Sequence, residues 1–555
     1  MDLIGDSDVD GKNEWDALRG ALILPNIGDT GRRCSKLALS GPPLSNEMLD
    51  DCNDASDEIQ RAPQFLAPLK TVPLPNLAAD FTGTVSVLDT AKENVRIFRR
   101  LGPEWLFTAA DHIFSAEELE AGLDLGIDAR DTRRPDGWDG LATIRLTLSG
   151  AEGSTTDDVQ VRVAPVLIHH HLQPVEQVLA VKGNATESPW IEKYVRDLSA
   201  AVNDAGLETA LYLFDGSDDI WAQDFMEPGF ASIPGPDGPI RVRIMVRSPQ
   251  DERVAGRQLF EYYRQAGVGA VQHLGGARDE INSAGNIETV PPHTANGKTW
   301  PAGRVILGDH GEQQHHILPY LRAQEVQEPI LLDTDWLVIG HVDEFLQFLP
   351  VDNARGWAVM VDDPRLAIKL LEELQVEGHG SLPAISRKND TQNGPGDCDG
   401  WGCDPIPVTP PTIDQILEDQ DLLLVNSQCA ERIDANIEIL KAEVGLTDGD
   451  FFRISAMFEQ SRWGGDDGDG KLQVGALFPG VINNLVLTGF NTCVAPNPWG
   501  PTPNGTDVLA TAILAEYAKL DIDIQFIDDW NSHHNYGGEV HCGSNSIRSM
   551  SDIWW

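Results

Sequence analysis

The front of the chain carries short runs in which apolar and polar residues alternate, separated by turn residues. Alternation with a period of two is typical of a strand that buries one face. A series of short strands with turns between them predicts an all-β sandwich. The runs cover residues 21–26, 82–89, 94–100, 141–150 and 158–168.

After about Gln173 the pattern changes, because strand-like apolar runs now alternate with longer stretches of helical periodicity. This alternation is typical of α/β structure. We therefore expect a β part over residues 1–172 and an α/β part over residues 173–555. Expected strands are 176–183, 210–214, 304–309, 335–340, 357–361, 422–426 and 484–489, and expected helices are 191–206, 365–378 and 430–445.

Three further segments are predicted to lie outside the main strands and helices. Pro, Gly and Asp are concentrated at 389–411, and Gly and Asp at 464–470, so both are predicted loops. The histidines at 169–171 are either a metal-binding patch or part of the loop between the two regions.

Acidic residues outnumber basic ones by 87 to 41, which gives a formal net charge of -46. Such a surface argues against nucleic-acid binding, because phosphate contacts need Lys and Arg. It favours cationic partners such as metal ions, basic peptides and guanidinium groups. No stretch approaches the ~20 apolar residues of a membrane helix. The first residues show no signal peptide, and the compartment stays open between cytoplasm and secretion.

The seven cysteines are an odd number, so at least one thiol is free. Cys398 and Cys403 either close a small disulfide or are two loop thiols. Near the start, Asp6, Asp8 and Asp10 have the spacing of a calcium loop. However, Ala17 stands where such a loop carries a bidentate Glu, so a solvated acidic turn is the alternative.

Reactive residues are concentrated in three short segments. If the chain stays extended through 341–343, the period of two places His341 and Asp343 on one face, where an imidazole and a carboxylate would meet. Each segment alone is a weak signal, because most isolated His-x-Asp pairs and loop cysteines are structural. The segments are 220–230, with Trp221, Gln223, Asp224 and Glu227; 335–350, with His341 and Asp343; and 537–548, with Glu539, His541 and Cys542.

Together these segments resemble the protein-arginine deiminases. The motifs WxQDxME, GHVDEFLxF and GEVHCGxN occur in the order of that family. The resemblance extends from about Ala21 to the end of the chain and leaves the family's usual first immunoglobulin-like domain without a counterpart. Further matching stretches lie at 24–34, 50–58, 282–292, 377–381, 478–487 and 554–555.

The resemblance implies a fivefold pseudosymmetric α/β propeller, the pentein fold, and hydrolysis of peptidyl arginine to citrulline and ammonia. Asp224 and Asp343 would accept hydrogen bonds from the guanidinium. Cys542 would attack its central carbon to form a thiouronium, and His341 would protonate the departing ammonia. Trp221 would line the arginine stem. Arg253 is the expected contact to the substrate backbone, although Glu252 fits that motif position equally well.

Calcium is also implied by the resemblance. For one ion the matching ligands are the side chains of Gln223, Glu227 and Glu288 and the carbonyls of Ala284 and Ile287. The front region, over residues 1–172, resembles the family's calcium-binding immunoglobulin-like β-sandwich domain. Its matching candidates for calcium are Asn26, Asp29, Asp51, Asp54 and Asp57.

A second calcium site of the family is altered in this chain. Ser248 and Asp251 are retained, but Phe225 and Arg247 stand where the family has carboxylates. We expect Arg247 to pair with Asp251 or another acid and to replace that ion; the alternative is that Arg247 is a surface residue.

Two other functions compete with a calcium-linked enzyme that acts on arginine-containing proteins or peptides. One is a related hydrolase that acts on free arginine or a small guanidine compound. The other is an inactive calcium-binding scaffold, which retention of Cys542, His341, Asp343 and Asp224 disfavours.

Overall fold

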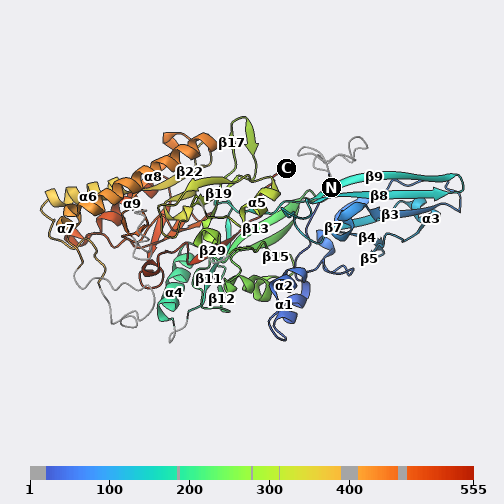
Figure 1. Ribbon diagram of the computed structural model, residues 1–555, viewed down its shortest axis with the longest axis horizontal. Helices are drawn as coiled ribbons and strands as arrows, with labels where there is room; N and C mark the ends of the chain where they lie inside the picture. The colour runs from blue at the N-terminus through green and yellow to red at the C-terminus, as the bar shows by residue number, and fades with distance from the viewer. Residues whose placement is uncertain (1–20, 184–187, 277–278, 312, 389–409, 461–471) are drawn as a thin grey trace.

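A computed structural model describes the chain except for residues 1–20, 184–187, 277–278, 312, 389–409 and 461–471. The calcium-like sequence at 6–17, the pair Cys398 and Cys403 and the acidic loop at 464–470 therefore lie outside the described residues. The molecule is elongated, with the front β-sheets at one end and a group of long helices at the other (Figure 1).

Two sheets form the front part. One has the strand order β1, β9, β8, β3, β6, and the other has the order β2, β7, β4, β5. The long β8–β9 hairpin pairs Leu141 with Arg162 at one end and Gly150 with Gly153 at the other. The strands are β1 Ala21–Ile23, β2 Ala67–Lys70, β3 Thr82–Val87, β4 Val95–Leu101, β5 Glu104–Phe107, β6 Phe114–Ser115, β7 Asp124–Ala129, β8 Leu141–Gly150 and β9 Gly153–Val163; the helices are α1 Arg33–Ala38, α2 Asn46–Asp51 and α3 Ala116–Ala121.

The rear part contains five sheets that repeat one pattern. In each, a middle strand is antiparallel to a first strand and parallel to a third. The first strands are β13 Met226–Ile233, β16 Ile287–Val290, β21 Leu346–Pro350, β26 Leu485–Leu487 and β29 Ser544–Arg548; the middle strands are β14 Ile240–Arg247, β19 Arg304–Asp309, β22 Trp357–Asp363, β27 Thr492–Pro496 and β11 Val175–Val181; the third strands are β15 Val268–Gln272, β20 Ile330–Asp333, β23 Phe451–Ser455, β28 Asp523–Ile527 and β12 Tyr212–Phe214. One of these sheets joins the two ends of the rear part, because its last strand, β29, pairs with β11, the first strand of the five repeated sheets in chain order.

Helices and short hairpins complete the rear part. The Asp419 side chain accepts a hydrogen bond from the Leu422 N–H at the start of α8, and Gly445 ends that helix with a positive φ of 73°. The remaining elements are α4 Pro189–Asp204, α5 Leu318–Gln324, α6 Pro364–Val376, α7 Ile413–Glu418, α8 Gln420–Val444, α9 Val508–Ala518, β10 Leu167–Ile168, β17 His293–Ala295, β18 Lys298–Trp300, β24 Phe458–Gln460 and β25 Val474–Ala476.

Two of the expected strands are wrong. Residues 422–426 lie in helix α8, because a short apolar run has the same appearance in a buried helix and in a strand. Residues 335–340 form turns with one isolated bridge from Leu337 to Val474. Trp336 and Leu337 are apolar because they are buried in a core, where they need no sheet.

The two parts share one apolar core. It runs from Leu22 and Val163 in the front sheets to Phe230 and Ile244 in β13 and β14. Helices α1 and α2 also contact the short helix Leu259–Tyr263 of the rear part. Burial of a continuous apolar surface at this junction stabilises the position of the front sheets against the rear part.

Candidate active site

Each candidate catalytic side chain lies in the turn that leads into the first strand of one of the five repeated sheets. Because these strands occupy equivalent positions, their leading turns can meet at one place. The turns carry Asp224 before β13, Ala284–Asn286 before β16, His341 and Asp343 before β21, Asn483 before β26, and Cys542 before β29.

Hydrogen bonds connect these turns directly. The Gln223 N–H donates to the Cys542 carbonyl at 3.1 Å, and the Ala284 N–H donates to the Asp224 carbonyl at 2.8 Å. Asn483 donates through Nδ2 to Oδ2 of Asp343 at 2.8 Å and accepts at Oδ1 from the Cys542 N–H at 3.2 Å. Segments more than 300 residues apart are thus held in register by backbone and amide groups.

The chain does not stay extended through residues 341–343, which was the condition for placing His341 and Asp343 on one face of a strand. Val342–Glu344 form a short 3-10 helix, and His341 caps it. The Glu344 side chain accepts from the His341 N–H at 2.7 Å, which closes the chain into this turn. His341 and Asp343 reach the same site from a helical turn, not from one face of a strand.

Cys542 is buried beside a carboxylate. Its Sγ lies 3.8 Å from Oδ2 of Asp343, and the residue is 5% exposed. Burial raises the pKa of the Cys542 thiol well above its ordinary value, and the charges of Asp343 and Asp224 raise it further. Without a bound cation, this sulfur is therefore a neutral thiol.

His341 has the opposite environment for its charge. Burial lowers the pKa of this imidazole, but the carboxylates of Asp224, Asp343 and Glu344 outweigh burial, so the pKa is raised. Its Nε2 is 2.9 Å from the Glu280 carbonyl, which assigns the proton to Nε2. Nδ1 has no hydrogen-bond partner among the described residues, so it is the nitrogen available for chemistry.

Two carboxylate oxygens next to the Cys542 thiol and the His341 ring are among the buried oxygens that lack a hydrogen-bond partner in the described part of the chain. They are Oδ1 of Asp224 and Oδ1 of Asp343. The second oxygen of Asp343 is engaged by His541 Nδ1 at 2.7 Å and by Asn483. Burial raises the pKa of Asp224 to about 6, against the lowering effect of Arg253. A buried acceptor without a partner is costly, so these two oxygens mark the position of a donor-rich ligand.

Two glycines permit the close approach of the reactive groups. A Cβ on Gly285 would lie 2.4 Å from Oδ1 of Asp224 and 2.9 Å from Nδ1 of His341. A Cβ on Gly538 would lie 2.6 Å from the Trp221 ring and 3.1 Å from Cβ of Cys542. Trp221 therefore borders the cysteine across Gly538, as expected for a wall of the site.

The residues expected to hold one calcium ion lie next to this site. Gln223 donates to Oε2 of Glu227 at 2.9 Å. Burial raises the pKa of Glu227 well above its usual value, and the nearby Glu288 raises it further; burial also raises the pKa of Glu288 to about 7. Two buried carboxylates and an amide oxygen form a hard oxygen donor set that fits calcium. The donor set fits a cation because the buried carboxylates of Glu227 and Glu288 repel each other, and a bound cation would offset this repulsion.

Glu288 also belongs to a cluster that can hold a metal ion, together with His171 and His541. The ligand atoms of the three buried side chains lie within 4.8 Å of one another, and no other such group occurs in the described ranges. The histidine triplet at 169–171 lies in the loop between β10 and β11, one of the two expected alternatives. All three side chains are buried, and His171 reaches Glu288 and His541.

The residues around the family's second ion do not fit a cation. Phe225 is buried against Phe214, and Arg247 is 1% exposed, so the idea that Arg247 is a surface residue is wrong. Its guanidinium donates to Asn46, Gln272 and the Arg253 carbonyl, which are all neutral acceptors. The expected pairing of Arg247 with Asp251, which is exposed, is therefore not formed.

Burial distinguishes the two candidates for a contact with the substrate backbone, Glu252 and Arg253. Glu252 is exposed, whereas Arg253 is 2% exposed and directs its guanidinium into a group of acids that includes Asp224. A direct contact of Arg253 with a substrate backbone is not supported by this position.

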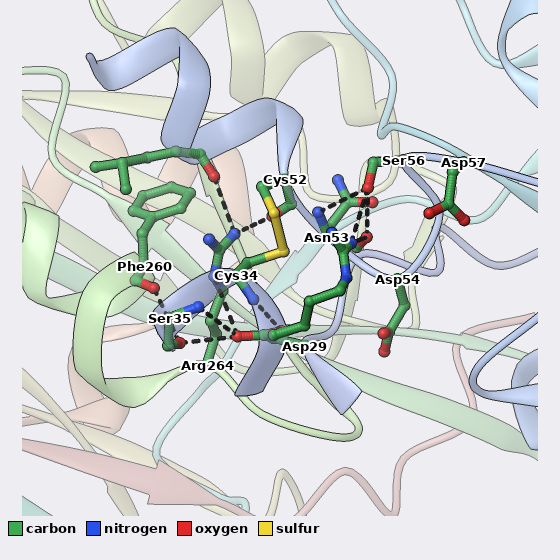
Figure 2. Close-up of a disulfide and its surroundings, with 12 residues drawn as sticks. Asp29, Cys34, Ser35, Cys52, Asn53, Asp54, Ser56, Asp57, Phe260 and Arg264 are labelled. Atoms are coloured by element: carbon green, nitrogen blue, oxygen red, sulfur yellow. Dashed lines mark hydrogen bonds and ion pairs between the residues drawn. A yellow bond between two sulfur atoms is a disulfide. The ribbon is translucent and has the colours of Figure 1, made fainter. Parts of the chain in front are cut away.

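The front candidates for calcium are held by separate hydrogen bonds. Asp29 accepts from the N–H groups of Cys34 and Ser35 (Figure 2). Asp54 accepts from the N–H of Thr30. Asn26 donates to Asp128, Asp57 pairs with Arg61, and Asp51 lies at the end of α2. In this arrangement the five residues do not share one centre.

Several residues at the site were not expected from the sequence. Asn483 lies within a stretch matched to the family, but no chemistry drew attention to an amide. Gly285 could be inferred only from its neighbours in space. The disulfide between Cys34 and Cys52 was also missed, since pairing of cysteines cannot be read from spacing alone.

Comparisons of this chain with known proteins identify a family and several relatives. Residues 153–555 match the family model described as Protein-arginine deiminase (PAD). Protein-arginine deiminase type-4 of Rattus norvegicus is 33% identical over 416 residues, which are 72% of this chain and 56% of that protein. The type-3 enzyme of Homo sapiens is 30% identical over 509 residues, which are 86% of this chain and 71% of that protein. The chain thus spans little more than half of the first relative. A solved agmatine deiminase of C. jejuni, 11% identical, covers 69% of this chain and 96% of its own with a TM-score of 0.35, from which we draw no conclusion.

Proposed function

This chain belongs to the protein-arginine deiminase family, and we propose that it hydrolyses peptidyl arginine to peptidyl citrulline and ammonia. The observation that carries the proposal is the pair of buried oxygens without partners, Oδ1 of Asp224 and Oδ1 of Asp343, beside the Cys542 thiol. A guanidinium is planar and has five N–H donors, so two separate carboxylates can fix its plane.

Binding of the substrate cation also prepares the nucleophile. The charges of Asp343 and Asp224 oppose ionisation of Cys542. A guanidinium between them offsets both charges and stabilises the thiolate, which is the reactive form. The thiolate then adds to the central carbon, and the C–N bond to the terminal nitrogen breaks to leave a thiouronium on Cys542.

His341 would manage the protons of both steps. Its raised pKa favours the protonated form, and Nδ1 is directed to the site. It gives a proton to the departing nitrogen, which leaves as ammonia, and then takes a proton from the water that attacks the thiouronium. Loss of the thiolate from carbon yields citrulline and restores Cys542.

We propose Gln223, Glu227 and Glu288, with the carbonyls of Ala284 and Ile287, as the ligands of one calcium ion. When bound, this ion would neutralise the two buried glutamates and order the turn that presents Asp224. Because Gln223 and Asp224 are adjacent in the chain, an ion bound by Gln223 would also restrict the motion of the Asp224 carboxylate that binds the guanidinium. The front candidates Asn26, Asp29, Asp51, Asp54 and Asp57 remain a weaker proposal.

We also propose the family's domain plan. Residues 1–172 would be an immunoglobulin-like calcium-binding domain, which the two mainly antiparallel front sheets support. Residues 173–555 would be a fivefold α/β propeller, which the five repeated sheets support. The proposed partners are arginine-containing proteins or peptides. Within the described ranges no helix is long and apolar enough to cross a membrane.

Citrulline release from a blocked arginine ester, with and without calcium, tests the function. We expect turnover by the parent protein and none by Cys542→Ser. A blocked arginine peptide should be turned over far better than free arginine, because a free carboxylate adds negative charge beside an acidic protein. Equal or better turnover of free arginine would favour a small guanidine compound as substrate. No turnover of any guanidine compound would favour the inactive scaffold.

A further inference from the structure

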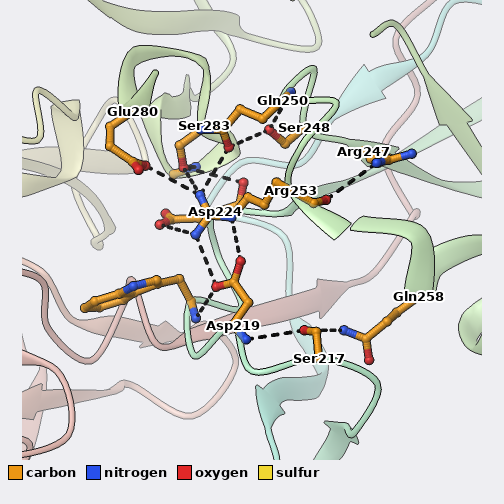
Figure 3. Close-up of polar contacts among 12 residues, drawn as sticks. Ser217, Asp219, Asp224, Arg247, Ser248, Gln250, Arg253, Gln258, Glu280 and Ser283 are labelled. Carbon is orange, nitrogen blue, oxygen red and sulfur yellow. Dashed lines mark hydrogen bonds and ion pairs between the residues drawn. The ribbon is translucent and has the colours of Figure 1, made fainter. Parts of the chain in front are cut away.

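A second guanidinium, which belongs to the protein itself, lies in the candidate active site. The Arg253 side chain is 1% exposed and forms ion pairs with Asp219, Asp224 and Glu280. Figure 3 shows its guanidinium at the centre of this group, between Asp219 on one side and Glu280 on the other. An arginine buried among acids with several directed contacts is a fixed part of the site, because leaving either charge unpaired would be costly.

The contacts of Arg253 occupy all three guanidinium nitrogens. Nε donates to Asp219 Oδ2 at 2.7 Å, and Nη2 donates to Asp219 Oδ1 at 3.2 Å, which makes a two-point contact. Nη1 donates to Gln250 Oε1 at 3.1 Å and lies 3.5 Å from Ser283 Oγ. These contacts leave Arg253 little capacity to bind a substrate in addition.

The remaining contact decides how Asp224 is presented. Nη2 of Arg253 donates to Oδ2 of Asp224 at 3.1 Å. The other oxygen, Oδ1, has no partner in the described part of the chain and points toward Gly285 and Nδ1 of His341. One oxygen of Asp224 is therefore held from behind, while the other is directed into the site.

We propose that Arg253 is a positioning residue that holds Oδ2 of Asp224, so that Oδ1 is fixed to accept the substrate guanidinium. Asp219 anchors Arg253 from the far side. This inference rests on the proposed deiminase function and assigns Arg253 a role behind the carboxylate, in place of a contact with the substrate. It also places a fixed cation among these acids, the role that was expected of Arg247.

Steady-state kinetics with a blocked arginine peptide test this role. In Arg253→Met, Asp224 loses its support, and we expect kcat/KM to fall about 100-fold or more, as for other small displacements of a reacting group. Asp219→Asn keeps Arg253 but loosens its anchor, and a fall of about tenfold is expected. Arg96→Met is the matched control, because Arg96 forms a buried two-point pair with Asp128 in the front sheets; its kcat/KM should match that of the parent.

Chemical rescue separates positioning from a general structural role. Arg253→Ala leaves a space that guanidinium ion fits, so added guanidinium should restore part of its activity and should only inhibit the parent. Thermal unfolding of each variant shows whether it is folded; if both Arg253 variants unfold, Asp219→Asn decides.

If the parent is active and the kcat/KM of Arg253→Met lies within about threefold of the parent's, the inference about Arg253 is overturned, while the proposed function stands. Asp219→Asn with the activity of the parent, or Arg253→Ala that guanidinium does not rescue, would also overturn it. A parent that releases no citrulline from any arginine substrate would overturn the proposed function, and this inference with it.

Discussion

Gly285 approaches Asp224 so closely that a Cβ on the glycine would lie 2.4 Å from Oδ1 of the carboxylate. The same Cβ would lie 2.9 Å from Nδ1 of His341. One missing side chain thus leaves room for two of the groups that we assign to the reaction, and the substrate guanidinium would bind next to this space.

Gly285→Ala is expected to lower kcat/KM by about 100-fold or more, because the added methyl displaces Asp224 and His341 from their positions. The measurement is citrulline release from a blocked arginine peptide, with circular dichroism to verify the fold. Gly475→Ala is the control, since a Cβ there would contact nothing within 4 Å. Full activity of Gly285→Ala would mean that the carboxylate is not used in its present position.

Cys542→Ser is expected to fold normally and to lose essentially all turnover, because a hydroxyl of ordinary pKa is a poor nucleophile without a dedicated base. Asp343→Asn should also be severely impaired, since one acceptor becomes in part a donor. Mass spectrometry of the parent, quenched during turnover, should detect an adduct on Cys542. Substantial citrulline production by Cys542→Ser would contradict the mechanism.

Alkylation of Cys542 should be strongly dependent on pH. Burial, Asp343 and Asp224 raise the pKa of the thiol well above 9, so at pH 7 the free enzyme holds it protonated. The thiolate fraction, and with it the iodoacetamide rate, should rise about tenfold per pH unit up to that pKa. Labelling of Cys542→Ser provides the background from all other cysteines of the chain, which include Cys429 and Cys493. A rate that is already independent of pH near 7 would indicate a stabilised thiolate in the free enzyme.

Calcium should stabilise the parent through one ion next to the active site. With calcium far above its dissociation constant, we expect the melting temperature to rise by about 1 °C per kcal/mol of binding free energy, the shift expected for a cooperative unit of this length. Glu227→Gln should abolish most of this shift, because it removes a carboxylate ligand. Asp251→Asn should leave the shift unchanged, and its loss would reveal a second ion. Activity should follow calcium with a shallow, single-site dependence.

The disulfide between Cys34 and Cys52 closes a loop with a sequence separation of 18. Arg264 donates to the carbonyls of Leu49 and Cys52, so this loop is also bound to the rear part. The double variant Cys34→Ser, Cys52→Ser should lose about 2–4 kcal/mol of stability, which is typical of disulfides. Differential scanning calorimetry measures the change. A reductant should lower the melting temperature of the parent and leave that of the double variant unchanged.

The sequence alone determined the elements whose pattern has a long, clear period. Alternation predicted the front strands β3, β4, β8 and β9, and helical periodicity predicted α4 and α6. Cys542, His341, Asp343 and Asp224 were proposed because their three motifs together resemble those of the protein-arginine deiminases. The sequence could not decide whether residues 422–426 are strand or helix, since both bury an apolar run.

Only the tertiary structure decided what these residues contact. Arg253 and Arg247 are both arginines near the same turn, yet one is surrounded by carboxylates and the other by neutral amides and a carbonyl. Asn483 and Gly285 have no reactive chemistry of their own, and they matter through distances to Asp343 and Asp224. Such roles depend on contacts between turns that are far apart in the chain, and local sequence patterns carry no information about which turns will meet.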